Sequence, residues 1–199
     1  MISGGLYFSE KGNSKVKFPI INVGSAMDCA SRKWCPFDRD NHKASGRRKC
    51  YAQATEQRFP KVLAQRRTNE AVIRDGLYDI SRLADDMAWA AVRLSNSSNT
   101  PTIRINEAGD LASWNIKFVV ALTQGLRARG IAVYLYSKAA AKLRNQVKAA
   151  GAVVLHSEHD FVAVKTAKDG AETGHAECPG TCGPCRICPE GGKAWILEH

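Results

Sequence analysis

The sequence contains no apolar run approaching the ~20 residues that a membrane-spanning helix needs. Met1 is not followed by the apolar core of a secretory signal peptide, and no segment is of low complexity. These absences disfavour a membrane or secreted protein. We therefore expect a cytosolic protein whose thiols stay reduced.

An even set of cysteines is also missing. The chain has seven cysteines, an odd number that argues against a closed set of disulfides and favours ligands or reactive thiols. Three precede residue 51 and four lie near the C-terminus: Cys29, Cys35, Cys50, Cys178, Cys182, Cys185 and Cys188.

Acidic residues are scarce from Ser31 to Arg74, a stretch that contains twelve Lys and Arg but only four Asp and Glu. The whole chain has a net charge of +10. This basic stretch carries the first cysteines and is a candidate phosphate-binding surface, although a solvated helix face explains it as well. Trp34 and Tyr51 beside the cysteines can stack on a base or shield a cluster. The candidate nucleic-acid residues are Arg32, Lys33, Trp34, Arg47, Arg48 and Lys49.

Strand and helix patterns alternate along the chain, which predicts an α/β fold with a parallel sheet. We expect strands at 18–24, 102–106, 131–137, 152–157 and 161–166, and helices at 51–72 (broken at Pro60), 75–96, 113–130 and 138–151. Four to five such units are too few for a closed barrel of ~250 residues, so a partial, open parallel β/α barrel fits the length. We expect this barrel over 1–169, a metal-binding tail without periodicity over 170–196, and a tag remnant at 197–199.

The carboxyl ends of parallel strands form the working face of such folds. Residues after the second and third main strands are candidates for cofactor binding: Arg104, Asn106, Glu107, Asp110, Ser137 and Lys138. An Arg104–Asp110 ion pair and a helix N-cap at Ser137 are the structural alternatives. Glu158, His159 and Asp160 form a cluster suited to proton transfer, or a plain surface loop.

The tail cysteines follow the pattern C-x3-C-x2-C-x2-C. Structural zinc usually uses two cysteine pairs separated by a longer loop, whereas short gaps are typical of iron–sulfur ligation. The pattern indicates a metal site, with a 4Fe–4S cluster favoured over zinc. The fourth cysteine of such a run can serve a second cluster.

The front group consists of three cysteines: Cys29, Cys35 and Cys50. A 4Fe–4S cluster on three cysteines leaves one iron without a protein ligand, and that open position is chemically useful, as in open catalytic zinc sites. A zinc site completed by His42 and a set of ordinary buried thiols are the alternatives.

Three cysteines after the first strand of a partial parallel barrel resemble the radical S-adenosylmethionine enzymes, although the spacing here is C-x5-C-x14-C instead of C-x3-C-x2-C. A closer likeness is to a group of phage-encoded proteins of unassigned role. They share Cys50-Tyr51-Ala52, Arg104 with Gly109-Asp110, "YLYSK" at 134–138 and the closing cysteines.

The resemblance implies two 4Fe–4S clusters, with S-adenosylmethionine bound through its amino and carboxylate groups at the open iron. It further implies an isomerase that rearranges an amino-acid adduct on a modified thymidine in phage DNA. A reductase or flavodoxin-type electron donor and the cytoplasm of an infected bacterial host would then be its setting. The alternative is a metal-stabilised nucleic-acid-binding protein in which the cysteines only fold loops and a basic face binds phosphate.

Overall fold

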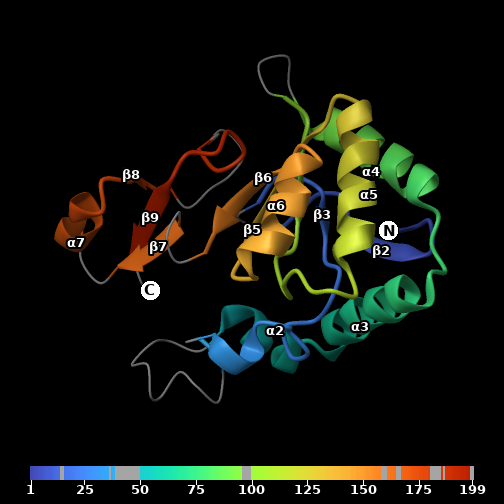
Figure 1. The fold of residues 1–199 in the computed structure, drawn as a ribbon, viewed down its shortest axis with the longest axis horizontal. Helices are drawn as coiled ribbons and strands as arrows, with labels where there is room; N and C mark the ends of the chain where they lie inside the picture. The colour runs from blue at the N-terminus through green and yellow to red at the C-terminus, as the bar shows by residue number, and fades with distance from the viewer. Residues whose placement is uncertain are drawn as a thin grey trace.

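The structure is a computed structural model, and it describes residues 1–13, 16–35, 37–38, 50–95, 100–157, 161–164, 167–179, 185 and 187–197. A six-stranded sheet of order β1-β2-β3-β4-β5-β6 lies at its centre (Figure 1). Its strands are β1 (Ile2–Ser3), β2 (Leu6–Ser9), β3 (Ile20–Ile21), β4 (Thr102–Ile105), β5 (Ala132–Ser137) and β6 (Val153–His156). The fold is α/β, as predicted.

Strands β3 to β6 are parallel and adjacent in chain order, whereas β1 and β2 add to the β3 edge as an antiparallel pair. The register places one residue of each parallel strand in a single row, Ile20, Arg104, Tyr134 and Val153. Side chains along a strand alternate between the two faces, so these four point to the same face of the sheet.

Helices α4 (Ile80–Leu94), α5 (Ile116–Ala128) and α6 (Ala141–Ala149) cover the other face (Figure 1). Their apolar sides pack on alternate strand residues such as Ile103, Val133 and Leu135 to form the main core. Each of these helices lies between two consecutive parallel strands. The expected order of strands and helices from residue 18 to residue 157 is therefore confirmed, whereas β1 and β2 were not predicted.

Local signals account for the helix ends. Helix α2 (Tyr51–Arg58) stops before Pro60, which opens α3 (Pro60–Asp75) at its first turn, where a missing N–H costs nothing. Gly76 ends α3 in the left-handed conformation, at φ +69°. The Asp79 carboxylate accepts a hydrogen bond from the Arg82 amide at 3.0 Å, so α4 starts five residues later than the pattern predicts.

The face of the sheet opposite the helices carries a second, smaller core. Phe18 packs edge-on against Tyr134 with ring centroids 6.2 Å apart, and Leu155 and Cys188 belong to the same buried cluster. A segment of the cysteine-rich tail therefore lies on this face of the central sheet.

The tail differs from the sequence-based expectation because it contains regular structure. Strands β7 (Phe161–Val164), β9 (Ala194–Leu197) and β8 (Ala176–Glu177) form a separate parallel sheet in the order β7-β9-β8, with α7 (Ala167–Glu172) packed on it (Figure 1). The 161–166 segment thus does not extend the central sheet. Leu197, expected to be a tag remnant, pairs with Val164. Strands this short leave no period to detect.

No helix in the described part of the chain has both the length and the apolar character needed to cross a membrane.

A candidate thiol-ligand site at the carboxyl edge of the sheet

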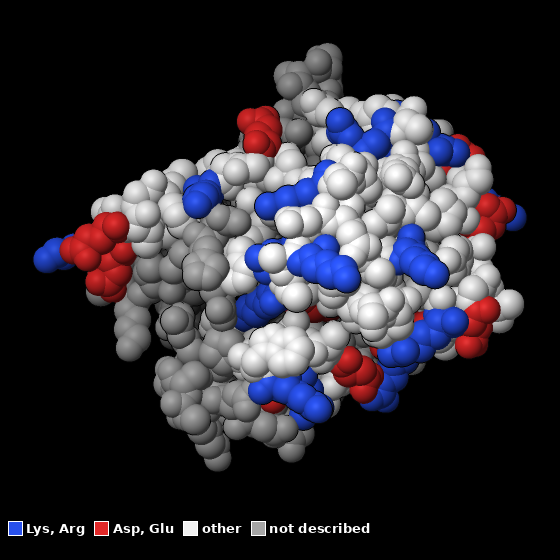
Figure 2. Space-filling model, viewed as in Figure 1, with Lys and Arg blue, Asp and Glu red and all other residues white. Residues whose placement is uncertain are grey.

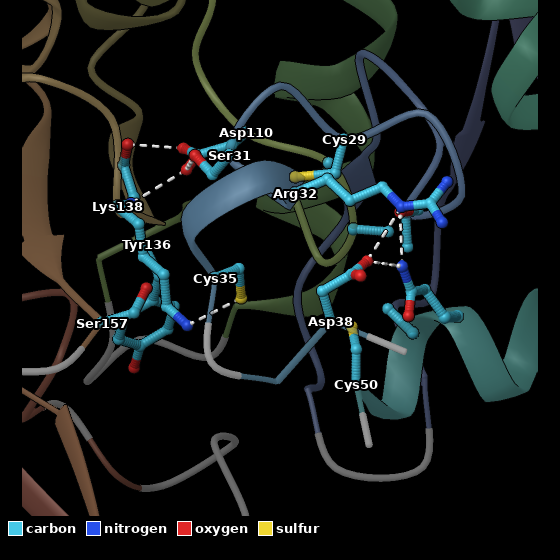
Figure 3. Close-up of a pocket in the computed structure, with 16 residues that line it drawn as sticks. Cys29, Ser31, Arg32, Cys35, Asp38, Cys50, Asp110, Tyr136, Lys138 and Ser157 are labelled. Carbon is cyan, nitrogen blue, oxygen red and sulfur yellow. Dashed lines mark hydrogen bonds and ion pairs between the residues drawn. The ribbon is translucent and has the colours of Figure 1, made fainter. Parts of the chain in front are cut away.

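A cavity of about 120 Å³ lies at the carboxyl ends of the parallel strands (Figure 3). The cysteine loop after β3, the start of α2, the loop after β4, the end of β5 and Ser157 after β6 all contribute to its wall. Its lining residues are Ala26, Cys29, Ser31, Arg32, Cys35, Asp38, Cys50, Ala52, Gln53, Ala108, Gly109, Asp110, Tyr136, Ser137, Lys138 and Ser157.

All three front cysteines line this one cavity. Cys29 and Cys35 lie on either side of the short helix η1 (Arg32–Trp34), and Cys50 immediately precedes α2 (Figure 3). Burial raises the pKa of the Cys29 thiol to about 12 and also raises the pKa of Cys50. Both thiols are therefore protonated at neutral pH, and a metal that takes them as ligands must displace those protons.

Lys138 places a positive charge against the sulfurs. Its Nζ donates to Cys35 Sγ at 3.3 Å and lies 4.1 Å from the centre of the Phe37 ring. The same ammonium group lowers the pKa of the Cys50 thiol, opposing the larger effect of burial. An ammonium in this position stabilises negative charge on sulfur.

The buried carboxylate of Asp110 joins three walls of the cavity. It accepts hydrogen bonds from the Ser31 hydroxyl in the cysteine loop, from the Ser137 hydroxyl at 2.5 Å, and from the Lys138 and Leu111 amides at 3.0 and 2.7 Å. Ser137 also accepts from the Ala139 amide at 3.1 Å. Asp110 thus fixes the cysteine loop relative to the end of β5 (Figure 3).

Replacing Asp110 by alanine leaves four donors, three of them buried, without their acceptor. We expect Asp110→Ala to lower the free energy of unfolding by about 3 kcal/mol, since each unsatisfied buried group costs roughly 1–3 kcal/mol and hydroxyls can rotate to new partners. Asp86→Ala is the matched control, because Asp86 accepts one side-chain hydrogen bond, from Ser3 at 2.5 Å, and should cost about 1 kcal/mol. Urea unfolding measures both. Equal losses would contradict a linking role for Asp110.

A glycine lets the loop after β4 reach the cysteine loop. Gly109 has φ +76°, and a Cβ at this position would lie 2.9 Å from the Gly24 carbonyl oxygen. Both the backbone angle and the close approach require glycine. The Asn22 side chain accepts from the Glu107 and Ala108 amides at 2.8 and 2.9 Å, which holds the same loop against the end of β3.

A buried ion pair holds the other side of the cysteine loop. The Glu56 carboxylate, on α2, accepts from the Ala26 and Met27 amides at 2.7 and 2.9 Å and from Arg66 of α3 at 2.8 Å. The Glu56 and Arg66 side chains are 0% and 7% exposed. The backbone that leads into Cys29 is therefore tied to two helices through one charged group.

A second polar contact closes the cysteine loop on itself. Asp38 is buried, forms an ion pair with Arg32 at 3.0 Å and accepts from Gln53 at 2.7 Å. The Cys50 amide donates to the Phe37 carbonyl at 2.6 Å. The chain segments that carry Cys35 and Cys50 are therefore bound to each other.

Three predicted cofactor residues lie outside the cavity wall. Arg104 donates to the Asn106 carbonyl at 3.2 Å and stacks over the Tyr136 ring at 5.1 Å, so its contacts are not those of the alternative ion pair with Asp110. Asn106 is buried at φ +63°, with its side-chain oxygen on the Val23 amide. Glu107 contacts Arg66 at 3.4 Å and Asn13 at 2.6 Å.

The other three predicted cofactor residues, Asp110, Ser137 and Lys138, do line the cavity. Ser137 is not the N-cap of the following helix, because α6 begins at Ala141 and its N-cap is Ala140. Its hydroxyl serves Asp110 instead.

Of the predicted nucleic-acid residues, Arg32 faces the cavity and pairs with Asp38, whereas Lys33 and Trp34 are exposed, Trp34 by 63%. Tyr51 is exposed too, and its hydroxyl donates to the Glu107 carbonyl at 2.9 Å. Arg47, Arg48 and Lys49 lie outside the described residues, as do His42 and the predicted proton-transfer cluster Glu158, His159 and Asp160.

The tail cysteines approach the cavity from the sheet face. Cys188 hydrogen-bonds Tyr136, and burial raises the pKa of its thiol, with a further contribution from Cys178 and Cys185. Tyr136 also lines the cavity, so one side chain contacts Cys188 and belongs to the wall that carries the front cysteines. Cys182 lies outside the described residues.

Among the residues that the structure describes, no three His, Cys, Asp or Glu side chains are grouped closely enough to hold a metal ion. The described cysteines form no disulfides. Metal ligation by the front cysteines therefore requires their side chains to move together.

Sequence reasoning missed the residues that support the site. Gln53, Glu56 and Tyr136 were assigned no role, yet they hold the cysteine loop or line the cavity. A signal was available for two of them: Gln53 and Glu56 are polar residues three apart on α2, on the same side as buried Ala52.

Comparison with curated proteins found no match, and neither did comparison with solved structures. A family profile described as "Gene product 88" matches residues 8–160, which include every residue of the cavity wall and none of the tail cysteines. With most of its length covered, the chain belongs to the Gene product 88 family.

Proposed function

We propose that this protein is an iron–sulfur enzyme of the radical S-adenosylmethionine type that acts on nucleic acid. One observation carries the proposal: Cys29, Cys35 and Cys50 come from distant points of one loop and line a single cavity at the carboxyl edge of the parallel strands. Three thiols without a fourth among the lining residues suit a cluster with one open iron.

The chemistry of the residues present fits such a cluster. Three sulfur donors are the ligands that iron–sulfur centres prefer. The Lys138 ammonium on Cys35 Sγ is the kind of hydrogen bond that tunes a sulfur-ligated centre. When bound, the cluster would supply the electron that cleaves S-adenosylmethionine and starts chemistry at an unactivated C–H bond.

The topology supports the finer fold assignment. Four parallel strands in chain order, with their connecting helices on one face, are the arrangement of a partial, open β/α barrel. The working site of such a fold lies in the loops at the carboxyl edge, where the three thiols are found.

The residues in and around the cavity would then have different roles. Asp110 and Glu56 hold the cysteine loop in place, and Ser137 and Lys138 lie where a polar group of the cofactor would enter. Tyr136 forms the wall toward the sheet face, and Arg104 stacks on its ring from outside the cavity. Glu158, His159 and Asp160 stay a predicted proton-transfer cluster.

The tail cysteines are proposed to hold a second cluster, with Tyr136 between the two groups. An electron donor such as a reductase or flavodoxin would reduce the centres. The substrate we propose is a modified thymidine in DNA, rearranged in the cytoplasm of an infected bacterial host.

A second candidate is a metal-stabilised nucleic-acid-binding protein without catalysis. The described thiols are not grouped for metal binding, and the cavity wall is tied together by polar side chains, as a structural loop requires. In that case zinc would serve as well as iron.

The deciding experiment uses anaerobically prepared full-length protein. We expect iron and sulfide close to two 4Fe–4S clusters, and formation of methionine and deoxyadenosine from S-adenosylmethionine after reduction. DNA containing an amino-acid adduct on thymidine should yield a rearranged nucleoside by mass spectrometry. Colourless protein with tightly held zinc would reject the enzyme and support the binding protein.

A further inference from the structure

The second half of the central sheet is built from a segment without any acidic residue. Between Leu111 and Ser157 the sequence has seven Lys and Arg and no Asp or Glu. This segment supplies both α5 and α6, which lie side by side on the helical face of the sheet (Figure 1).

The exposed surface of these helices is basic. Figure 2 shows lysine and arginine side chains and uncharged residues over α5 and α6, with the acidic side chains around this area. We call this surface the α5–α6 face, and its exposed cations are Lys117, Arg127, Lys142 and Lys148, with half-buried Arg144 between them. A Cβ added to Gly151 would lie 3.2 Å from Arg127 Cγ, so the two helices also meet at their carboxyl ends.

The acidic residues that the structure describes do not neutralise this face. Lys117, Lys142 and Lys148 enter no ion pair among the described residues, and Arg144 and Arg127 donate only to the backbone carbonyls of Ala139 and Ile131. The basic stretch from Ser31 to Arg74 behaves differently. Arg66, Arg67 and Arg74 in that stretch pair with Glu56, Asp28 and Glu70.

The α5–α6 face also lacks the apolar anchors of a protein interface. The exposed large hydrophobic side chains of the described residues lie in the first 94 residues and none belongs to α5 or α6. Gln124, Asn145 and Gln146 are exposed between the cations. Protein interfaces depend on buried aromatic and aliphatic anchors, whereas cations mixed with amides suit a phosphate backbone.

We propose that the α5–α6 face binds the phosphate backbone of duplex DNA, independently of sequence. Helix α5 has 13 residues and is about 20 Å long, enough to reach phosphates on both sides of a major groove of ≈ 12 Å. This inference deepens the proposed function by giving the polymer a docking surface apart from the cysteine loop.

The face ends at the cavity. Lys117 and Lys142 lie in the first turns of α5 and α6, and α6 follows directly on the cavity residues Ser137 and Lys138. Duplex bound along the helices would therefore extend to the carboxyl edge of the sheet, where the thiols are located.

The test compares two full-length triple variants of equal net charge. Lys117→Gln/Lys142→Gln/Lys148→Gln removes cations from the face, and Lys11→Gln/Lys17→Gln/Lys168→Gln removes exposed lysines elsewhere. Affinity for a labelled duplex is measured against salt concentration. If each lysine of the face neutralises one phosphate, the first variant reduces the slope of log K against log salt by about 2.7, from roughly 0.9 per phosphate. The control should change the slope little.

Equal changes of the salt slope in both variants would overturn the proposal, and so would a wild-type protein that does not bind the duplex. A preference for single-stranded RNA that persists in the Lys117→Gln/Lys142→Gln/Lys148→Gln variant would overturn it as well. Iron and sulfide content separates this inference from the proposed function. A duplex-binding protein without iron would reject only the enzyme, whereas a protein with both clusters and no duplex affinity would reject only the docking face.

Discussion

Replacing Cys29, Cys35 and Cys50 by alanine should remove one of the two clusters and abolish cleavage of S-adenosylmethionine. The three sulfurs line one cavity, so their loss deletes every thiol from its wall. The tail cysteines are untouched and should keep their own metal. Anaerobic protein should therefore retain about half of the wild-type iron and sulfide, measured by chemical analysis and by electron paramagnetic resonance after reduction.

The matched control replaces Cys178, Cys185 and Cys188 instead. This variant should lose the other half of the iron, and the absorption spectrum of the remaining cluster should match that of the front site. If the front triple variant keeps all its iron, the front cysteines are ordinary thiols and the radical mechanism fails. Circular dichroism of each variant excludes unfolding as the cause of metal loss.

Glu56→Ala should be among the most destabilising substitutions in the chain. Glu56 is buried, and its removal leaves the Arg66 guanidinium without its ion-pair partner on α2 and two amides of the cysteine loop without their acceptor. Breaking a buried pair in this way costs about 3–5 kcal/mol. Urea or guanidinium unfolding should show this loss, and metal content should fall with it because the cysteine loop loses its attachment.

The pair Glu70 and Arg74 on α3 provides the comparison. It joins residues four apart, with the Arg74 side chain 47% exposed, so Glu70→Ala should cost less than about 1 kcal/mol. The double variant Glu56→Leu/Arg66→Met should recover part of the loss of Glu56→Ala, because an uncompensated charge no longer lies buried. A Glu56→Ala protein as stable as Glu70→Ala would contradict the interpretation that Glu56 ties the cysteine loop to α2 and α3.

The sequence alone determined the succession of strands and helices from residue 18 to residue 157. Local signals decide these elements: Pro60 opens a helix, Gly76 ends one, and alternation marks strands such as Thr102–Ile105. The chain order then implies that the loops after the parallel strands share one edge, which is why Cys29, Asp110 and Ser137 line one cavity.

Only the tertiary structure decided which polar residues support the site. Glu56 and Arg66 lie ten residues apart on two helices, and Asp110 and Ser31 are separated by 79 residues in the sequence. No local sequence pattern predicts either contact. The small sheet of the tail was missed for the same reason, because β8 ends at Glu177 and β9 begins only at Ala194. Pairing between distant residues depends on packing, which short-range periodicity does not encode.

The tertiary structure also determined which basic residues form no ion pair with a described acidic residue. The composition concentrates cations between Ser31 and Arg74, but folding brings Glu56, Asp28 and Glu70 against three of them. The acid-free segment from Leu111 to Ser157 has fewer cations and looks less basic in the sequence, yet its exposed lysines meet no acid among the described residues. Surface charge depends on which partners folding brings within a few ångströms, because Coulomb interactions between exposed groups fall off within about 10 Å.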